Sequence, residues 1–176
     1  MKHIDWDNVE EVKNFEKLPA GGYVCGITAV EDVPEKEYLK FEFDIAEGEH
    51  KNEFRNLYDA KGFWGATFVK SYKEKARGFF KKMLTAFEQS NSGFKFNDDE
   101  KVFKRKFIGL VVGYEEYTAN DGTVKQRLIV TDWLPVKDIK DGNFTVPKLK
   151  TLYGDSEKTS NNDGFKELDD DGDLPF

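Results

Sequence analysis

The spacing of apolar residues predicts one well-defined strand at residues 37–48. Apolar and polar side chains alternate there with a period of two. One face carries Leu39, Phe41, Phe43 and Ile45. The other face carries Tyr38, Lys40, Glu42 and Asp44. This alternation is typical of a strand that is buried on one side and exposed on the other.

Four further segments, rich in β-branched and aromatic residues, also predict strands: 23–33, 50–60, 104–118 and 123–136. Gly26 in the first of them predicts a bend or a bulge. The third places Ile108, Leu110 and Val112 on one face and Phe107 and Val111 on the other. The fourth places Leu128, Val130 and Leu134 opposite Arg127, Ile129, Thr131 and Trp133. The sequence ANDG at 119–122 predicts a tight hairpin turn between these last two strands.

The period changes to threes and fours in residues 71–93, which predicts an amphipathic helix. Its apolar face carries Tyr72, Ala76, Phe79, Phe80, Met83, Leu84 and Phe87. Ser71 is the expected N-cap, and the sequence SNSG is expected to end the helix. Gly78 lowers helix propensity, so we expect a close packing neighbour at that position. A shorter helix is expected within residues 1–18, ending before Pro19.

Three strands, a helix and a two-stranded hairpin follow one another along the chain. A five-stranded Greek-key barrel of the OB type, with its helix between the third and fourth strands, has this order. We therefore predict a mainly β protein with one helix and this barrel, although other small α+β folds share the order. The domain is expected to span residues 1–154, with an extension laid on the barrel from about residue 137. Residues 155–176 have the polar, acidic composition of a disordered tail.

Charge is unevenly distributed between these two parts. The whole chain has a formal net charge of −7 and a pI near 5.0, which would argue against a nucleic-acid binder. Residues 155–176 contain eight acids and two lysines and so carry −6, which leaves −1 on residues 1–154. Local charge on the nearly neutral body must therefore decide what it binds.

Several classes of protein find no support in the composition. No apolar run approaches the ~20 residues that span a bilayer, and residues 1–12 lack the apolar core of a secretory signal, so we expect a cytoplasmic protein without a membrane partner. The single cysteine, Cys25, excludes an internal disulfide and a Cys-rich zinc site. Cys25 lies in an apolar strand, where a buried thiol is expected rather than a nucleophile. His3 and His50 have no partner at metal-ligand spacing. We therefore expect no enzyme activity, no metal and no cofactor.

Aromatic residues make up 15% of the chain, and many of them are interleaved with bases. This pairing suits a single-strand binder, because flat rings stack on bases while Lys and Arg follow the phosphates. The candidate DNA-binding residues are Tyr38, Lys40, Phe54, Arg55, Tyr58, Lys61, Phe63, Trp64, Tyr72, Lys104, Arg105, Lys106, Lys125, Arg127 and Trp133. The alternative for each ring is core packing. For Phe63 and Trp64, the flanking Gly62 and Gly65 favour an exposed loop that stacks on a ligand.

Residues 169–176, DDDGDLPF, resemble the C-terminal tip of bacterial single-stranded-DNA-binding proteins. In that family an acidic run ends in Asp, an aliphatic residue, Pro and Phe. The matching residues are Asp173, Leu174, Pro175 and Phe176, preceded by Asp169, Asp170 and Asp171. The sequence departs from the family at Leu174, where Ile is commoner, and at Gly172 within the acidic run. The segments FEKLPAGGYVCGI, SNSGFKF and NDGTVKQRLIVTDWLPVKDIKDGNFTVPKLKTL also resemble phage and mobile-element replication proteins of the same role.

The resemblance implies that the tip is a docking peptide for replication, recombination or repair proteins. The terminal Phe side chain of the family enters an apolar pocket on the partner, a basic residue takes the α-carboxylate, and the aspartates meet a basic rim. We therefore predict a protein that coats single-stranded DNA with little sequence preference and recruits partners through its tip. A homo-oligomer is compatible with this function.

Two other functions remain open from the sequence. The first is a protein–protein adaptor that uses an OB barrel without binding nucleic acid, which the nearly neutral body allows. The second is a small enzyme of DNA metabolism such as a nuclease, which would need a buried cluster of carboxylates that the strands do not show.

Overall fold

The computed structural model describes residues 2–9 and 16–153, and the predicted acidic tail lies outside this range. Five strands form one antiparallel sheet in the order β3-β2-β1-β4-β5. The strands are β1 (Gly21–Val33), β2 (Tyr38–Ile45), β3 (Thr67–Ser71), β4 (Phe107–Thr118) and β5 (Val124–Leu134). The α-helices are α1 (Glu53–Lys61), α2 (Arg77–Ser90) and α3 (Val136–Lys140). Short 3-10 helices are η1 (Trp6–Asn8), η2 (Pro34–Lys36), η3 (Glu74–Ala76) and η4 (Glu100–Phe103).

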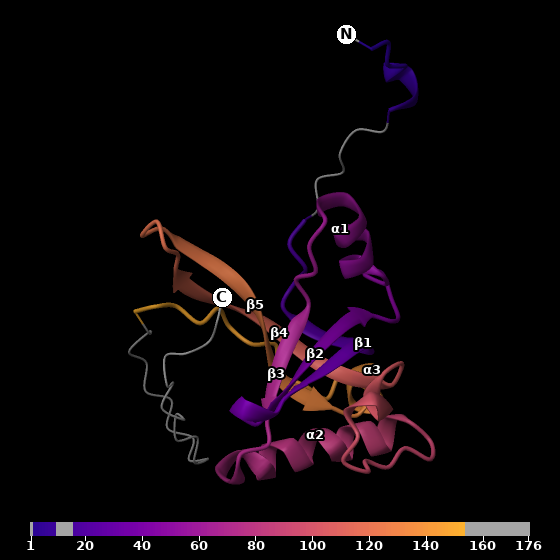
Figure 1. The fold of residues 1–176 in the computed structure, drawn as a ribbon, viewed down its shortest axis with the longest axis vertical. Helices are drawn as coiled ribbons and strands as arrows, with labels where there is room; N and C mark the ends of the chain where they lie inside the picture. Colours follow the sequence, from indigo (N-terminus) through magenta and orange to yellow (C-terminus); the bar gives the residue numbers. More distant parts are fainter. Residues whose placement is uncertain (1, 10–15, 154–176) are drawn as a thin grey trace.

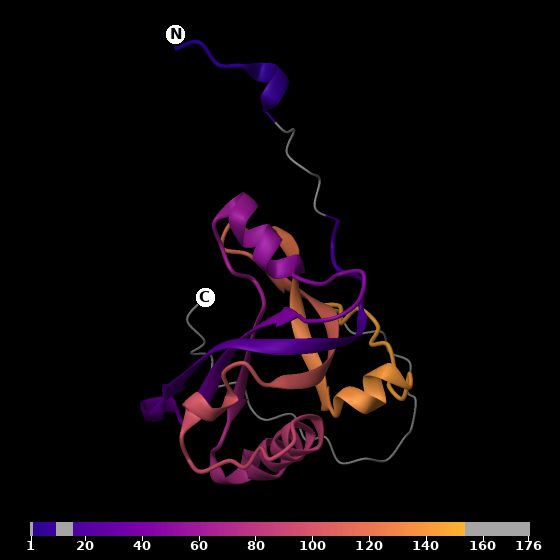
Figure 2. The ribbon, with the colours of Figure 1, turned by 90° about the vertical axis from the view of Figure 1, so that its right-hand side faces the viewer.

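Two helices mark opposite ends of the sheet. Figures 1 and 2 both place α1 at one end and α2 across the other, while the β4–β5 hairpin extends beside α1. The mainly β character and the position of the long helix between β3 and β4 agree with the prediction from the sequence. In the part of the chain that the structure describes, no helix is both long and apolar enough to cross a membrane.

The core lies between the sheet and α2 and is rich in phenylalanine. The predicted inner face of β2 is confirmed, since Phe41 and Phe43 have no exposed surface. The Phe41 ring stacks on Phe68 of β3 at 4.7 Å and meets Phe103 edge-on at 5.2 Å. Burial of such rings is the main favourable contribution to folding. Among the described residues, eight phenylalanines are buried, namely Phe41, Phe43, Phe54, Phe68, Phe80, Phe87, Phe94 and Phe103.

The prediction of a strand at residues 50–60 is wrong, because most of this segment forms α1. The carboxylate of Asp44, at the end of β2, accepts hydrogen bonds from the backbone N–H groups of Phe54 and Arg55 at 3.0 and 3.1 Å. These are amides of the first turn, which have no partner within the helix. Gly62, with φ +76°, ends the helix in the left-handed conformation that glycine adopts without strain. The third strand forms later, at Thr67–Ser71.

Three local predictions near α2 and β1 also differ from the structure. Phe79, expected in the core, is 47% exposed; it lies in the first turn of α2, and the buried side chains of this helix are Phe80, Met83, Ala86 and Phe87. A Cβ atom at Gly78 would meet nothing within 4 Å, so no close neighbour explains that glycine. Ser71 ends β3 instead of capping the helix, and its hydroxyl accepts from the N–H of Lys73. The irregularity expected at Gly26 lies between Ile27 and Ala29 instead.

A bulge in β5 reverses the predicted face of Trp133. Val111 pairs with Asp132 but Val112 pairs with Val130, so Thr131 is an extra residue on β5. Beyond the bulge the side chains change faces. Trp133 therefore packs against the core together with Leu128 and Val130, and not beside Arg127 as predicted.

The segment after β5 packs back on the sheet. A Cβ atom on Gly109 of β4 would lie 2.4 Å from Cγ1 of Ile139 in α3, so only glycine allows α3 to approach this closely. Further along, Lys150 forms a parallel bridge with Glu115, and its N–H donates to the carbonyl of Tyr114 at 3.0 Å. These contacts hold α3 and the following residues against β4.

Candidate functional site

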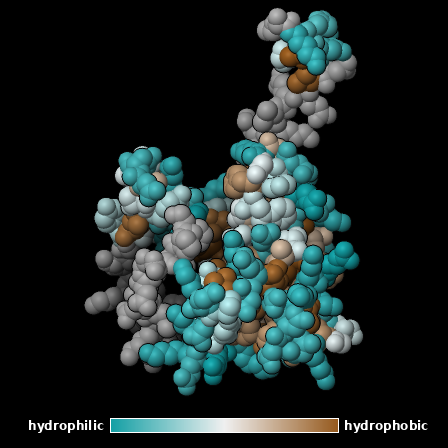
Figure 3. Space-filling model, in the orientation of Figure 1, coloured by the Kyte–Doolittle hydropathy of each residue, from teal (hydrophilic) through white to brown (hydrophobic). Residues whose placement is uncertain are grey.

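A groove of about 450 Å³ lies between α1 and the β4–β5 hairpin. These two elements project as separate arms in the ribbon of Figure 1 and on the surface in Figure 3. One wall comes from Lys61, Phe63 and Gly65, at the end of α1 and in the loop after it. The other comes from Tyr114, Tyr117 and Arg127 of the hairpin, and Lys17 and Leu18 complete the lining before β1. The groove therefore joins segments that are far apart in the sequence.

The loop from Gly62 to Gly65 exposes one aromatic side chain, Phe63, whereas Trp64 is partly buried and packs against the core. Phe63 is 55% exposed although it is large and apolar. A Cβ atom on Gly65 would lie 3.1 Å from Cε2 of Phe63, so this glycine lets the ring fold over the backbone. Next to it, Tyr58 and Trp64 form a tilted ring pair with centroids 6.1 Å apart, and Nε1 of Trp64 donates to the carbonyl of Ala66 at 3.2 Å. The loop thus holds Trp64 in place and presents Phe63 to solvent.

The opposite wall combines rings with positive charges. Nε of Arg127 donates to Glu115 at 2.6 Å, and its guanidinium lies 5.4 Å from the centroid of the Tyr117 ring. Nζ of Lys17 lies 3.7 Å from the centroid of the Tyr114 ring and donates to the side chain of Gln126. Such cation–π contacts fix the orientation of both partners.

The hydroxyl of Tyr114 anchors the hairpin wall to the segment before β1. It donates to the carbonyl of Leu18 at 2.6 Å. Burial, together with Tyr23 and the negative charge of Glu53, raises the pKa of Tyr114 to about 12, so this donor keeps its proton at physiological pH. The hydrogen bond of Tyr114 therefore fixes the hairpin wall of the groove relative to the segment before β1.

The charge of the groove is mixed, with a small excess of bases. Lys17, Lys61 and Arg127 line it together with two acids, Glu16 and Glu53. Of the predicted residues, the structure brings Lys61, Phe63, Arg127 and the largely buried Phe54 to this groove and Tyr58 and Trp64 to its edge.

A second basic region lies at the other end of α1. Arg55 lines a hollow of about 420 Å³ with Ile27 and Thr28 of β1 and with Asp44, whose carboxylate accepts from the first-turn amides of α1. The same part of β1 is bound by the turn that contains Lys104, Arg105 and Lys106. Arg105 donates its N–H to the carbonyl of Ile27 at 2.8 Å, and the carbonyl of Lys106 accepts from the N–H of Ile27 at 2.9 Å. Through Arg55 and Lys61, α1 links this region to the groove.

Phe54 lines the groove, but it is only 6% exposed and packs edge-on against Phe43, so its ring belongs mainly to the core. The remaining candidates lie elsewhere. Lys40 lies beside Glu31 and Glu42. Tyr38 pairs with Ser71 at the α2 end of the sheet, and the Tyr72 hydroxyl donates to Asp32 at 2.9 Å. Lys125, in the hairpin, lies 3.9 Å from the carboxylate of Asp121.

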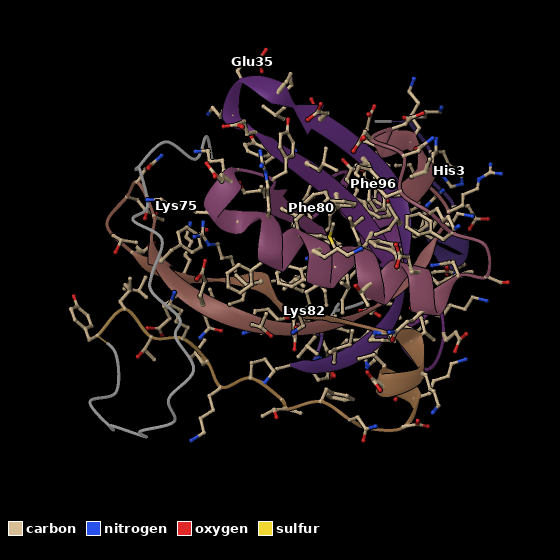
Figure 4. The ribbon with its side chains drawn as sticks, turned by 90° about the horizontal axis from the view of Figure 1, so that it is seen from below. His3, Glu35, Lys75, Phe80, Lys82 and Phe96 are labelled. Carbon is tan, nitrogen blue, oxygen red and sulfur yellow. The ribbon has the colours of Figure 1, made fainter. Side chains whose placement is uncertain are left out.

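Trp133 lies in the seam between the two edge strands, β3 and β5. Its ring meets Phe68 of β3 at 5.8 Å, and Nζ of Lys70 lies 3.2 Å from its centroid. Lys70 is only 7% exposed. The pKa of Lys70 is lowered to about 8, chiefly by burial and also by the positive charge of Lys82, while Asp132 opposes the shift. Figure 4 shows Lys82 on the side of α2 that faces β5, where it pairs with Asp132.

The lowered pKa of Lys70 makes stability depend on pH in a defined window. Between about pH 8 and 10.5 the unfolded chain binds the proton that the folded protein has released, so the contribution of Lys70 to the free energy of unfolding rises with pH. The rise is expected to reach up to about 3 kcal/mol. The substitution Lys70→Met should remove this pH-dependent rise. The variant should also be at least as stable as the wild type at pH 7.

Urea denaturation at pH 7, 8, 9 and 10 checks this expectation, with the exposed Lys81→Met on α2 as control. The Lys70 contribution is the difference between the wild-type and Lys70→Met profiles, because burial raises the pKa of both Cys25 and Tyr114. These two groups lower the free energy of unfolding of both proteins as the pH rises above about 9 and 10, respectively. A wild-type profile parallel to that of Lys70→Met would contradict the assignment.

Sequence reasoning missed Lys17, Tyr114 and Tyr117. Lys17 stands outside any strand, and only the folded chain brings it to the hairpin. The two tyrosines flank Glu115 and Glu116, and the prediction selected aromatic residues that are interleaved with bases. Their position just before the ANDG turn, where a strand approaches its exposed tip, was the available signal.

Comparison with known proteins does not assign the site. No family model and no curated protein matches the chain. Among the described residues, no group of three or more His, Cys, Asp or Glu side chains is placed to hold a metal ion.

Proposed function

We propose that this protein binds single-stranded DNA without marked sequence specificity and recruits replication, recombination or repair proteins through Asp169–Phe176. The observation that carries the proposal is the groove between α1 and the β4–β5 hairpin, which combines an exposed ring, Phe63, with the bases Lys61 and Arg127. Stacking on such rings contributes about 1–3 kcal/mol per base and tolerates any sequence. The bases supply contacts to phosphates. The proposal includes no catalytic step and no cofactor.

An OB-type barrel is the proposed architecture behind this site. Closing a sheet of order β3-β2-β1-β4-β5 into a barrel brings β3 and β5 together. The contacts of Phe68 and Lys70 with Trp133 across this seam support such a closure, with side chains in place of a hydrogen-bonded ladder. Barrels of this type bind oligonucleotides on one face and in the loop between the last two strands, and the groove is lined by the two strands that flank this loop, β4 and β5.

The proposed DNA path uses both basic regions. It starts in the groove at Arg127 and Lys61 and runs along α1 to Arg55 and the turn at 104–106. The other face, around Lys40 and Tyr72, carries acidic neighbours and is left out of the path.

Photo-cross-linking tests the location of the site. A single-stranded oligonucleotide substituted with iododeoxyuridine is expected to cross-link to peptides that contain Tyr58, Phe63 or Tyr117, because halogenated bases react with the aromatic side chains on which they stack. Mass spectrometry identifies these peptides. Cross-links confined to peptides of α2 or to Tyr38 and Tyr72 would contradict the proposed path.

A second function, an adaptor that does not bind nucleic acid, is favoured by one observation. The groove is not strongly basic, since Glu16 and Glu53 line it beside Lys17, Lys61 and Arg127. On this alternative the groove would hold a peptide, and no single-stranded oligonucleotide would cross-link there.

A further inference from the structure

A second pocket is lined by residues of α2 and of the strands near it, and it shares no lining residue with the groove. This α2 pocket has a volume of about 450 Å³. Its floor is apolar and aromatic and consists of Leu39, Tyr72, Phe80, Leu84 and Phe96. Figure 4 shows Phe80 and Phe96 close together beside α2, and their ring centroids lie 5.9 Å apart. The pocket is large enough for one bulky apolar side chain of a ligand.

The rim of the α2 pocket is acidic. Asp32, Asp98 and Glu100 line it, against one base, Arg77. Nε of Arg77 donates to the carbonyl of Tyr72 at 3.3 Å, which holds this base at the backbone. Burial and the hydrogen bond to Asp32 raise the pKa of Tyr72, and the negative charges of Glu37 and Glu35 raise it further. Negative charge therefore predominates around the opening.

We propose that the α2 pocket docks a short basic segment of a partner protein. One apolar or aromatic side chain of that segment enters the pocket, and Lys or Arg residues on either side of it meet Asp98 and Glu100. Charge complementarity selects this occupant, because the acidic rim repels both the phosphates of a nucleic acid and an acidic peptide such as Asp169–Phe176. The site is thus separate from the proposed DNA path in position and opposite to it in charge.

The test uses the full-length protein and a fluorescein-labelled peptide, Lys-Lys-Leu-Phe-Lys-Lys. Fluorescence anisotropy is expected to show saturable binding. The double variant Asp98→Asn/Glu100→Gln should bind about threefold to tenfold more weakly, since it loses two ion pairs at a partly exposed rim. Asn is a safe replacement at position 98, where φ is +61°. The matched control is Glu88→Gln, an exposed acid of α2 away from the pocket, and it should bind as the wild type does.

Two further measurements complete the test. Replacing Leu-Phe by Ala-Ala in the peptide should weaken binding about tenfold or more, because the apolar anchor is lost. The double variant should keep wild-type affinity for oligo-dT, which separates this inference from the proposed DNA function.

Three results would each overturn the proposal. One is the absence of saturable binding to the wild-type protein. Another is equal affinity for the acidic peptide Glu-Glu-Leu-Phe-Glu-Glu. The third is an affinity that Asp98→Asn/Glu100→Gln leaves unchanged, because the basic peptide would then bind elsewhere, for instance to the acidic residues 155–176.

Discussion

Replacing Phe63 with alanine is expected to weaken the binding of single-stranded DNA about fivefold or more. The Phe63 ring is 55% exposed in a groove that also presents Lys61 and Arg127. A ring that stacks on a base contributes about 1–3 kcal/mol, which corresponds to a factor of roughly 5 to 150 in affinity. Because the ring lies outside the core, its removal should not lower the free energy of unfolding by more than about 0.5 kcal/mol. Anisotropy of a labelled oligo-dT measures the first effect and urea denaturation the second.

The matched control for this prediction is Phe79→Ala. Phe79 is also an exposed phenylalanine, at 47%, but it lies on α2 at the other end of the sheet. Its replacement should leave the affinity for oligo-dT within a factor of about two, consistent with the small effects of surface substitutions. Equal losses of affinity in Phe63→Ala and Phe79→Ala would show that the groove is not the binding site.

Deleting residues 169–176 is expected to abolish partner binding and to leave DNA binding equal or stronger. The deletion removes four aspartates from a segment whose net charge is −6, so it removes negative charge that competes with phosphates for the basic path. It also removes Leu174, Pro175 and Phe176, the apolar triplet proposed to anchor the partner. A terminal aromatic anchor of this kind carries a large part of the energy of a small interface, so its loss should reduce capture about tenfold or more.

The single substitution Phe176→Ala tests the docking role alone, with Phe165→Ala as the control in the same segment. Immobilised wild-type protein should retain replication or repair proteins from extract that Phe176→Ala does not retain, while Phe165→Ala should retain them. Adding one residue after Phe176 should have the same effect as Phe176→Ala, because it displaces the α-carboxylate. Loss of oligo-dT binding on deletion of 169–176 would refute the separation of the two roles.

Elements whose period is set within one segment could be predicted from the sequence. In β2 the alternation that buries Phe41 and Phe43 depends only on the pleat, so both side chains lie where expected. The same holds for the ANDG turn, where Gly122 has φ +79°. The exposed position of Phe63 could also be predicted, since the two glycines of this loop have local roles. Gly62 ends α1, and Gly65 makes room for the Phe63 ring.

Features that depend on distant partners could not be predicted. The segment 50–60 contains enough aromatic residues for a strand, and it is a helix because Asp44 accepts its first-turn amides. Trp133 faces the core because a bulge at Thr131 shifts the register by one residue. No pattern in the local sequence predicts this bulge. Lys17 reaches the groove only because the segment before β1 passes the hairpin, where Tyr114 donates to the carbonyl of Leu18.

The most direct test of the DNA-binding function is a titration of the intrinsic tryptophan fluorescence with oligo-dT at increasing salt. Trp64 lies at the edge of the groove, so bound bases should change its emission. With Lys17, Lys61 and Arg127 in the groove, the logarithm of the association constant should fall with the logarithm of salt concentration with a slope of about −2 or steeper. No change in fluorescence at low salt, or an affinity that does not vary with salt, would contradict the proposed function.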